Sequence, residues 1–428
     1  MTKRRILFAP LGYFLSHLSR CLAVADVLKD RGHDIGFVCV PKDAAWLASL
    51  GYQVFPAYSM PAGDIMAYGA PFEYQQKYLG SKFSAISSRS FAIERMVKDD
   101  LAIYACFKPD LLVWSGRPTA PATASLKGIA AVGINNLSMP IDNQPACDAS
   151  TEVQGRMTLE LQFKKELKDY LAPAIQKSDQ YLRYVRAIPW IVPGLPVLEN
   201  KAMLALLGRP VHHYVGQLHW RGWDAMLQPE AGRYEHKTVI LVTLGSTFPF
   251  ADIAHHVLSA FADERFHVIV NTGDQFMIDA QDAPGHHEVL PLICLRAYLQ
   301  ISHVVLHHGG HGTTMEVLNA GLPSVVIPFN GDQIDISLRL EQFGCALRIG
   351  KYPGDISAGE VAQALHKVLD DPSYRDNAQR FSQELARWPD GATMAADLIE
   401  KHELQMQNFT NPMASTDDTR SATVVSRP

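Results

Sequence analysis

The stretch RILFAPLGYFLSHLSRCLAVADVLKDRGHDIGFVCV (residues 5–40) decides the fold of this chain. Apolar residues dominate 5–9 and 35–40, which is typical of buried strands. Between them, residues 18–30 repeat apolar side chains at helical spacing, and residues 31–33 (Arg-Gly-His) end the helix with basic residues and a glycine. A strand, a helix and a second strand in this order form a βαβ unit, which predicts a parallel sheet.

The same alternation recurs along the chain. A strand at 109–114, a helix at 119–127 and a strand at 130–134 follow the pattern in the first half. Residues 228–237 are charged, contain a proline and a glycine and lack apolar periodicity, which is typical of a linker. A second array comes next, with expected strands at 238–243, 266–271, 288–292, 304–308 and 324–329, and expected helices at 253–261, 313–319, 334–343, 358–369, 374–387 and 392–404.

This pattern predicts an α/β protein with two Rossmann-like, doubly wound domains that face a central cleft, because open parallel sheets bind ligands at the carboxyl ends of their strands. A length of 428 residues fits two domains better than one core. Two less regular stretches, 58–98 and 139–197, either contact substrate or only pack outside the first domain. We expect an N-terminal domain at 1–227, a linker at 228–237, a C-terminal domain at 238–388, a further helix at 389–404 and a disordered tail at 405–428.

Composition argues against several classes of protein. The formal net charge is −5 and charged residues make up 19%, which disfavours a nucleic-acid binder. The six cysteines form no Cys-x-x-Cys pair, which zinc knuckles and thioredoxin-like proteins require. Apolar runs are too short for a signal peptide or a membrane span. We therefore expect a cytoplasmic protein without stable membrane insertion, of unassigned oligomeric state.

The most informative motif is HHGGHGTTME (residues 307–316), which follows an expected strand and opens an expected helix. Its glycines let backbone N–H groups approach an anion, and the helix N-terminus adds partial positive charge, so a pyrophosphate is the natural ligand. His308 and Thr313 can donate hydrogen bonds to it, and Glu316 can accept bonds from ribose hydroxyls. The histidines also suggest a metal site, but no fourth ligand has motif spacing and a metal leaves the glycines unexplained.

Three further signals lie near the ends of other expected strands. Asp332 and Gln333 offer acceptors and an amide donor for vicinal sugar hydroxyls, although Asp332 alone also fits a helix N-cap. Residues 245–247 (Gly-Ser-Thr) are small donors that can reach a phosphate across the cleft. His17 can take a proton from an acceptor hydroxyl, although an ordinary helix-start histidine has the same local context.

Together these residues resemble the nucleotide-sugar-dependent glycosyltransferases of family 1, which have the GT-B fold. The resemblance covers residues 4–404. The family opens with Gly-His-x-x-Pro, an Ala/Leu-rich helix and Arg-Gly-His, and this chain has Ser16 in place of the glycine and Arg20 in place of the proline. The family's donor signature is similar to residues 308–316 followed by Asp332-Gln333.

The resemblance implies that His17 is the general base and that the last helix, 389–404, returns to the first domain. His308, Gly312 and Thr313 would bind the pyrophosphate, Glu316 the ribose, and Asp332 with Gln333 the sugar hydroxyls. The full set of implied donor-binding residues is Gly245, Ser246, Thr247, Leu290, Leu292, His308, Gly310, Gly312, Thr313, Glu316, Asp332 and Gln333.

Two departures from the family pattern affect the site. The family's Trp-x-Pro-Gln segment corresponds to residues 289–292 (Val-Leu-Pro-Leu), so the base would rest on Leu290 and Leu292, and uracil versus thymine stays open. The Asp that orients the catalytic histidine in many members is replaced by Ser115 and Gly116. Either another group orients His17, or activation is weaker.

The expected reaction is the inverting, metal-independent transfer of a hexose or deoxyhexose from a UDP- or dTDP-sugar to a hydroxyl of a small, apolar acceptor such as a secondary metabolite, as in antibiotic biosynthesis. No cofactor is expected besides this nucleotide-sugar co-substrate. Two alternatives remain. A sugar-nucleotide epimerase requires further acid/base carboxylates in the cleft, and a non-catalytic GT-B partner of another transferase requires loss of the donor loop.

Overall fold

The computed structural model describes residues 2–60, 93–136, 188–198, 212–245, 251–273, 285–329, 331–350 and 356–406. The tail at 405–428 lies outside these ranges apart from its first two residues. The same holds for most of the irregular stretches at 58–98 and 139–197.

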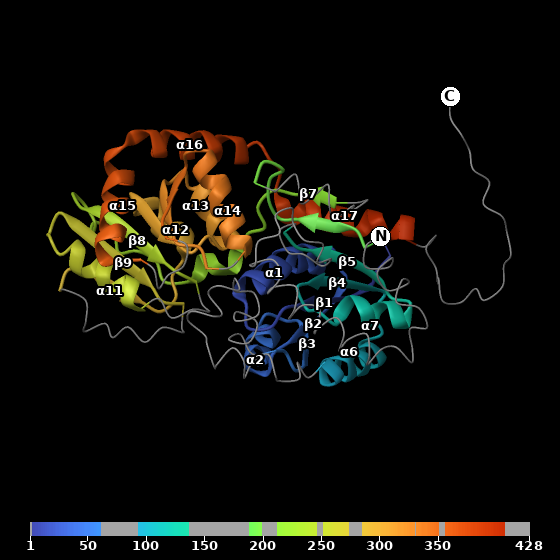
Figure 1. Ribbon diagram of the computed structural model, residues 1–428. Helices are drawn as coiled ribbons and strands as arrows, with labels where there is room; N and C mark the ends of the chain where they lie inside the picture. Colours follow the sequence, from blue (N-terminus) through green and yellow to red (C-terminus); the bar gives the residue numbers. More distant parts are fainter. Residues whose placement is uncertain are drawn as a thin grey trace, which may run out of the picture.

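The first half of the chain forms a seven-stranded parallel sheet in the order β3-β2-β1-β4-β5-β6-β7 (Figure 1). Its order reverses at β1, which pairs with both β2 and β4. Loops on either side of such a reversal diverge and leave a crevice at the carboxyl ends of the strands. The strands are β1 (Arg5–Pro10), β2 (Asp34–Cys39), β3 (Gln53–Pro56), β4 (Leu111–Ser115), β5 (Ala130–Ile134), β6 (Trp190–Val192) and β7 (His212–Tyr214).

The second half forms a six-stranded parallel sheet in the order β10-β9-β8-β11-β12-β13. Here the order reverses at β8, between β9 and β11. The strands are β8 (Thr238–Thr243), β9 (Phe266–Asn271), β10 (Glu288–Leu290), β11 (Val304–His307), β12 (Ser324–Val326) and β13 (Ala346–Arg348).

Helices flank both sheets. Around the first sheet lie α1 (Leu15–Asp30), α2 (Pro41–Ser49), α6 (Ile93–Phe107), α7 (Ala120–Lys127) and the short 3₁₀ helix η2 (Arg221–Ala225). Around the second lie α11 (Ala251–Ala260), α12 (Leu295–Ile301), α13 (His311–Asn319), α14 (Gly331–Gln342), α15 (Ala358–Asp370) and α16 (Pro372–Leu385). The last helix is α17 (Gly391–Met406).

The predicted fold class, an α/β protein with two parallel, doubly wound sheets, is confirmed. Several details differ from the expectation. The less regular stretches 58–98 and 139–197 were expected to contain some amphipathic helix, and α6 begins at Ile93 within the first, whereas the strand β6 within the second was not predicted. The strands expected at 288–292 and 324–329 end at Leu290 and Val326. Prolines follow in both stretches, and a proline cannot donate the next hydrogen bond to a neighbouring strand.

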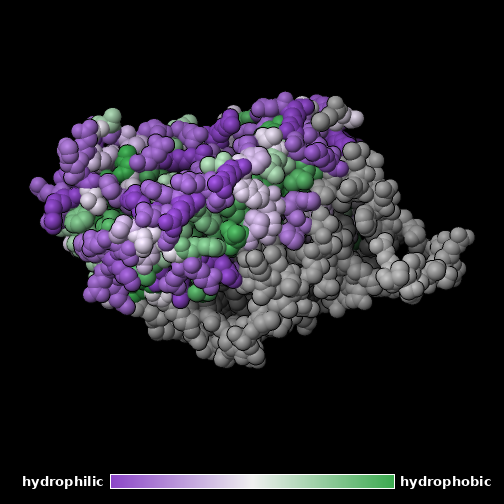
Figure 2. All heavy atoms as spheres, turned by 90° about the horizontal axis from the view of Figure 1, so that it is seen from above, coloured by the Kyte–Doolittle hydropathy of each residue, from purple (hydrophilic) through white to green (hydrophobic). Residues whose placement is uncertain are grey.

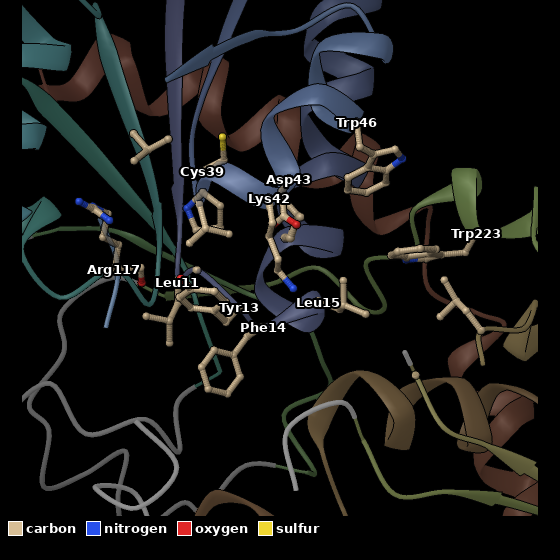
Figure 3. A pocket seen from close by; sticks show the side chains of 18 of the residues that line it. Leu11, Tyr13, Phe14, Leu15, Cys39, Lys42, Asp43, Trp46, Arg117 and Trp223 are labelled. Carbon is tan, nitrogen blue, oxygen red and sulfur yellow. The ribbon is translucent and has the colours of Figure 1, made fainter. Parts of the chain in front are cut away.

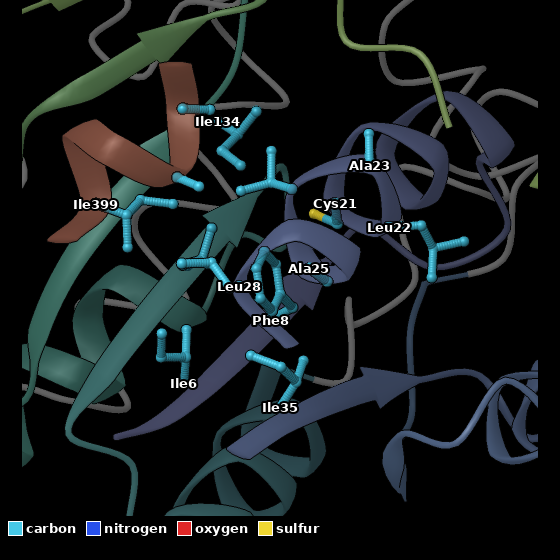
Figure 4. Packing of buried hydrophobic residues seen from close by; sticks show 14 of the residues in the cluster. Ile6, Phe8, Cys21, Leu22, Ala23, Ala25, Leu28, Ile35, Ile134 and Ile399 are labelled. Atoms are coloured by element: carbon cyan, nitrogen blue, oxygen red, sulfur yellow. The ribbon is translucent and has the colours of Figure 1, made fainter. Parts of the chain in front are cut away.

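Helix α17 packs on the first sheet, although the chain reaches it from the second (Figures 1 and 4). Its apolar side, with Ala395, Ala396 and Ile399, belongs to the same buried cluster as Phe8 and Leu28 of the first half. Ion pairs fix the same contact, because Arg31 pairs with Asp397 and Glu400, and His33 bonds Glu400.

The two halves also touch beside the sheets. Phe14 of the first half packs against the buried cluster of the second sheet, and Leu195 and Leu198 pack with Met315 of α13. The described part of the upper face is largely hydrophilic (Figure 2). Among the helices within the described ranges, none combines the length and apolar character that crossing a membrane requires.

Candidate active site

His17 lies in the first turn of α1, directly after the loop that leaves β1. Its side chain is only 7% exposed. Nδ1 lies 3.0 Å from Oγ of Ser115, the last residue of β4, which pairs with β1. The sheet therefore brings together two residues that are 98 positions apart in the sequence.

The hydrogen bonds of Ser115 determine which ring nitrogen of His17 carries the proton. The Ser115 hydroxyl donates its single proton to the carbonyl oxygen of Ile134, at 2.8 Å. Its oxygen must then accept the second bond, so Nδ1 of His17 is the donor. In this tautomer Nε2 has a free lone pair, and within the described residues it has no hydrogen-bond partner. Nε2 is therefore available to accept a proton.

Burial and positive neighbours keep His17 neutral. Burial is the largest cause that lowers the pKa of His17 well below 6.5, and the charges of Arg20 and His311 act in the same direction. Gly116 follows Ser115 with φ +79°, and a Cβ there would lie 2.7 Å from Cε1 of His17. The glycine thus leaves space for the imidazole ring, a role that sequence reasoning did not assign to it.

The predicted donor loop forms the entry to α13. Gly310 precedes the helix, and no side chain caps it. The first helical bond is donated by the Thr314 N–H to the Gly310 carbonyl, so the N–H groups of the three preceding residues have no partner within the helix. Such an uncapped N-terminus binds anions.

His308 packs into the donor loop against two glycines. A Cβ on Gly310 would lie 2.2 Å from Nε2 of His308, and one on Gly245 would lie 2.9 Å from its Cε1. These glycines therefore make room for the histidine as well as for close approach of a ligand. Burial lowers the pKa of His308 to about 4, and its Nδ1 is buried without a partner among the described residues. His307 is fully buried and its Nδ1 accepts the Gly309 N–H, as expected of a packed histidine.

Glu316 lies one turn into α13, but its carboxylate already has two partners. His219 Nδ1 is 2.8 Å from Oε1 and Arg296 Nε is 2.9 Å from Oε2. Burial raises the pKa of Glu316, but these two partners outweigh burial and the net shift is downward. A carboxylate oxygen accepts more than one hydrogen bond, so a ribose could share Glu316 with His219 and Arg296.

Asp332 and Gln333 begin α14, next to the donor loop. The helix starts at Gly331, so Asp332 is in its first turn and is not the N-cap of a helix that starts near Ile334. Gln333 is 5% exposed, and its side-chain oxygen accepts the Phe329 N–H at 2.8 Å. A Cβ on Gly309 would lie 3.1 Å from the Gln333 carbonyl oxygen, which shows how closely the two segments approach. The side-chain carbonyl of Gln333 is thus already used in a hydrogen bond that holds the backbone at Phe329.

A cavity of about 200 Å³ opens beside the first turn of α1 (Figure 3). Phe14 and Leu18, which flank His17 in the sequence, line it, and so does Leu292 from the predicted base-binding segment. Its wall is mostly aromatic and aliphatic, with three charged side chains, Lys42, Asp43 and Arg117. Other lining residues are Leu11, Tyr13, Leu15, Trp46, Trp223 and Met226.

The structure brings most of the predicted site residues together, but not all of them can be placed. His308, Gly310, Gly312, Thr313 and Glu316 share one loop and helix, Asp332 and Gln333 adjoin it, and Gly245 contacts it. Leu290 ends β10 and packs into the second domain. Ser246 and Thr247 lie outside the described residues.

Sequence reasoning missed the tryptophans near the cavity. Trp46 stacks on Trp223 with ring centroids 6.0 Å apart, and Trp220 packs edge-on against both. Trp46 lies far from Trp220 and Trp223 in the sequence. The only sequence signal for the cluster was that all three residues are aromatic. Among the residues that the structure describes, no three His, Cys, Asp or Glu side chains gather in a metal-binding arrangement.

Comparisons with known proteins agree with this architecture. Residues 255–401 match the family model described as "Erythromycin biosynthesis protein CIII-like, C-terminal domain". The NDP-glycosyltransferase YjiC of Bacillus licheniformis is 29% identical over 168 residues, 38% of this chain and 41% of the relative. The TDP-daunosamine transferase DnrS of Streptomyces peucetius is 27% identical over 155 residues, 35% of this chain and 36% of the relative. Both matches thus span less than half of each relative's own length.

A solved structure extends the likeness over nearly the whole chain. The glycotransferase of kitacinnamycin superposes with a TM-score of 0.70 at 20% identity, covering 94% of this chain and 99% of the other, which shows a common fold. Taken together, these findings show that the chain has the GT-B fold and that its second domain is similar in sequence to nucleotide-sugar glycosyltransferases.

Proposed function

We propose that this protein transfers a hexose or deoxyhexose from a UDP- or dTDP-sugar to a hydroxyl of a small, apolar acceptor, with inversion at the anomeric carbon. Two relatives, an NDP-glycosyltransferase and a TDP-daunosamine transferase, support a nucleotide sugar as the donor. The descriptions of the matching family model, erythromycin biosynthesis, and of the similar structure, the glycotransferase of kitacinnamycin, support a secondary metabolite as the acceptor class.

The observation that carries the proposal is the arrangement of His17 and Ser115. Ser115 holds Nδ1 protonated and leaves Nε2 as a base, and the low pKa of His17, caused first by burial, keeps that base unprotonated near neutral pH. In the proposed step, Nε2 takes the proton of the acceptor hydroxyl as its oxygen attacks the anomeric carbon. The bond between that carbon and the diphosphate breaks on the opposite face, so one displacement inverts the configuration.

The donor loop supports the other half of the reaction. The uncapped N–H groups of α13, together with His308, would bind the leaving diphosphate, whose negative charge grows as the bond breaks. We propose that this stabilisation replaces a divalent metal ion. Addition of EDTA should therefore leave the rate unchanged, and loss of activity would contradict the metal-independent mechanism.

The cavity beside α1 supports an apolar acceptor. Phe14 lines the cavity and packs edge-on against the His17 ring, with 6.2 Å between the ring centroids, although His17 itself does not line it. Aromatic and aliphatic walls gain free energy by removing apolar acceptor surface from water. Lys42, Asp43, Ser59 and Arg117 provide the polar contacts that would orient it.

The proposal is tested with His17→Asn, measured by sugar transfer and, separately, by calorimetric binding of UDP and dTDP. A general base contributes roughly 10²–10⁴-fold to a rate, so kcat should fall by about that factor while nucleotide affinity stays unchanged. His236→Asn, the same substitution at an exposed histidine, is the control and should behave as wild type.

Two results would reject parts of this assignment. Loss of nucleotide binding in His17→Asn would mean that His17 belongs to the donor site and is not the base. If wild-type protein binds none of the nucleotides, the chain would instead be a non-catalytic GT-B partner of another transferase.

A further inference from the structure

Arg20 is a buried cation on the side of α1 that also carries His17. Only 5% of its surface is exposed. Its Nε donates to the Ser16 carbonyl at 3.0 Å, and its Nη1 lies 3.5 Å from Oδ1 of Asn136. Both partners are neutral, and within the described residues Arg20 forms no ion pair.

The position of Arg20 is next to the donor loop of the other domain. Ser16, which holds Nε, approaches Gly312 so closely that a Cβ on this glycine would lie 3.8 Å from Cβ of Ser16. The positive charge of Arg20 affects histidine pKa values in both domains. After burial, it is the next cause that lowers the pKa of His17 in the first domain and of His311 at the start of α13.

A guanidinium in this position has unused binding capacity. Arg20 has five N–H donors, and among the described residues only Ser16 and Asn136 bond two of them, which leaves three. Burial of a charge is costly unless an opposite charge compensates for it. The negative charge of Asp332 acts on Arg20 by raising its pKa, against the larger lowering by burial. A second polar group nearby, Nε2 of His311, is buried and has no hydrogen-bond partner among the residues that the structure describes.

We propose that Arg20 is a donor-binding residue that contacts the diphosphate of the nucleotide sugar from the first domain, opposite the N-terminus of α13. This inference rests on the proposed function. Arg20, the uncapped α13 N-terminus and His311 together form an anion site made by both domains. Diphosphate oxygens match it best because they are anionic in every nucleotide sugar and lie at the helix N-terminus.

This role gives Arg20 two effects on the reaction. Its fixed positive charge stabilises the leaving diphosphate as negative charge develops, and because it comes from the first domain, donor binding draws the two domains together. A bound diphosphate also neutralises Arg20, which removes one of the charges that disfavour protonation of His17. Nε2 then becomes a stronger base when the donor is in place.

The test compares nucleotide binding by calorimetry in wild type, Arg20→Met and Arg20→Gln. UDP and dTDP probe the diphosphate, and uridine and thymidine probe the rest of the site. Each neutral variant should weaken the diphosphates about 10- to 100-fold and leave the nucleosides unchanged. Arg380→Met, at an exposed arginine, is the control and should match wild type. The side-chain amide of Arg20→Gln retains N–H donors for Ser16 and Asn136. This variant therefore tests diphosphate binding even if Arg20→Met does not fold.

Three outcomes would overturn the inference. Unchanged UDP and dTDP affinity in folded Arg20→Gln would show that Arg20 does not contact the diphosphate. A loss confined to UDP-glucuronate, with UDP-glucose and UDP unaffected, would mean that Arg20 binds a sugar carboxylate instead. Absence of nucleotide binding in the wild type would reject the proposed function itself, together with this inference.

Discussion

Ser115 provides a neutral hydrogen-bond partner for His17, where the resemblance leads one to expect an aspartate. A hydroxyl that donates to a backbone carbonyl can select the Nδ1–H tautomer as a carboxylate does, although a neutral acceptor makes the weaker hydrogen bond. It adds no negative charge to stabilise the imidazolium that forms when Nε2 takes a proton. Together with burial, Arg20 and His311, this keeps the His17 base weak but unprotonated at neutral pH.

Replacing Ser115 by alanine should therefore impair the base without affecting the donor site. In Ser115→Ala the imidazole loses the partner that fixes its tautomer, and kcat should fall by about tenfold or more, within the range that general-base catalysis contributes. UDP and dTDP affinity should not change. Ser49→Ala also removes a hydroxyl that bonds a carbonyl, but at the surface, and should have wild-type kcat. Equal kcat in wild type and Ser115→Ala would show that Ser115 does not position His17.

The pH profile tests the same pair of residues. In the proposed mechanism only the unprotonated form of His17 is active, so kcat/KM should fall as pH drops through its pKa. Because that pKa is below 6.5, by burial first and then by Arg20 and His311, the acid limb should lie below pH 6.5. Rates measured from pH 4.5 to 8 check this. A limb above pH 6.5 would contradict the neutral, buried state of His17.

At the scale of elements, the turn after β4 positions the His17 ring together with Ser115, the last residue of β4. Gly116 has φ +79°, a conformation that glycine adopts easily, and lies against the His17 ring. Gly128, which ends α7, has φ +63° but nothing within 4 Å of the site of a Cβ. A side chain would strain the backbone at both glycines, but only at Gly116 would it also clash with the His17 ring.

Gly116→Ala and Gly128→Ala should consequently differ in activity more than in stability. Alanine at a positive φ costs about 1 kcal/mol in either turn. Only Gly116→Ala also displaces the His17 ring, so kcat should fall sharply in this variant and remain near wild type in Gly128→Ala. Transfer assays and urea unfolding measure both quantities. Similar kcat values in the two variants would contradict the steric role of Gly116.

At the scale of the whole molecule, α17 couples the two domains, because it follows the second domain in the chain and packs on the first. The chain leaves α16 on the second sheet and buries Ile399 in the core of the first, where Glu400 also bonds Arg31 and His33 (Figure 4). Unfolding of the first domain must therefore release a helix that is covalently attached to the second.

Ile399→Ala should destabilise this docking. Removing a fully buried isoleucine costs about 2–5 kcal/mol in transfer and cavity free energy. Urea unfolding followed by tryptophan fluorescence, which reports on the first-half Trp46, Trp114 and Trp190, should shift to lower denaturant concentration. Lys401→Ala, two positions along on the exposed side of α17, should leave the transition in place. An unshifted transition in Ile399→Ala would show that α17 does not stabilise the first domain.

Local patterns in the sequence were sufficient for the fold class and for the donor loop. Strands such as 238–243 and 266–271 were predicted at their observed bounds because apolar runs between polar turns depend on neighbouring residues alone. Short elements were harder. The strands β6 and β7 have three residues each, too few for a periodicity to appear. The roles of the donor-binding residues stay predictions.

The sequence by itself determined two parallel αβ arrays and a glycine-rich loop at a helix N-terminus, since hydrophobic period, glycine content and helix start signals are local properties. Only the tertiary structure decided what lies next to His17 and Arg20. Ser115 is 98 residues from His17, Asn136 is 116 residues from Arg20, and Glu400 is 369 residues from Arg31. The physical reason is that strand pairing and helix packing choose such partners through long-range contacts, which no local spacing encodes.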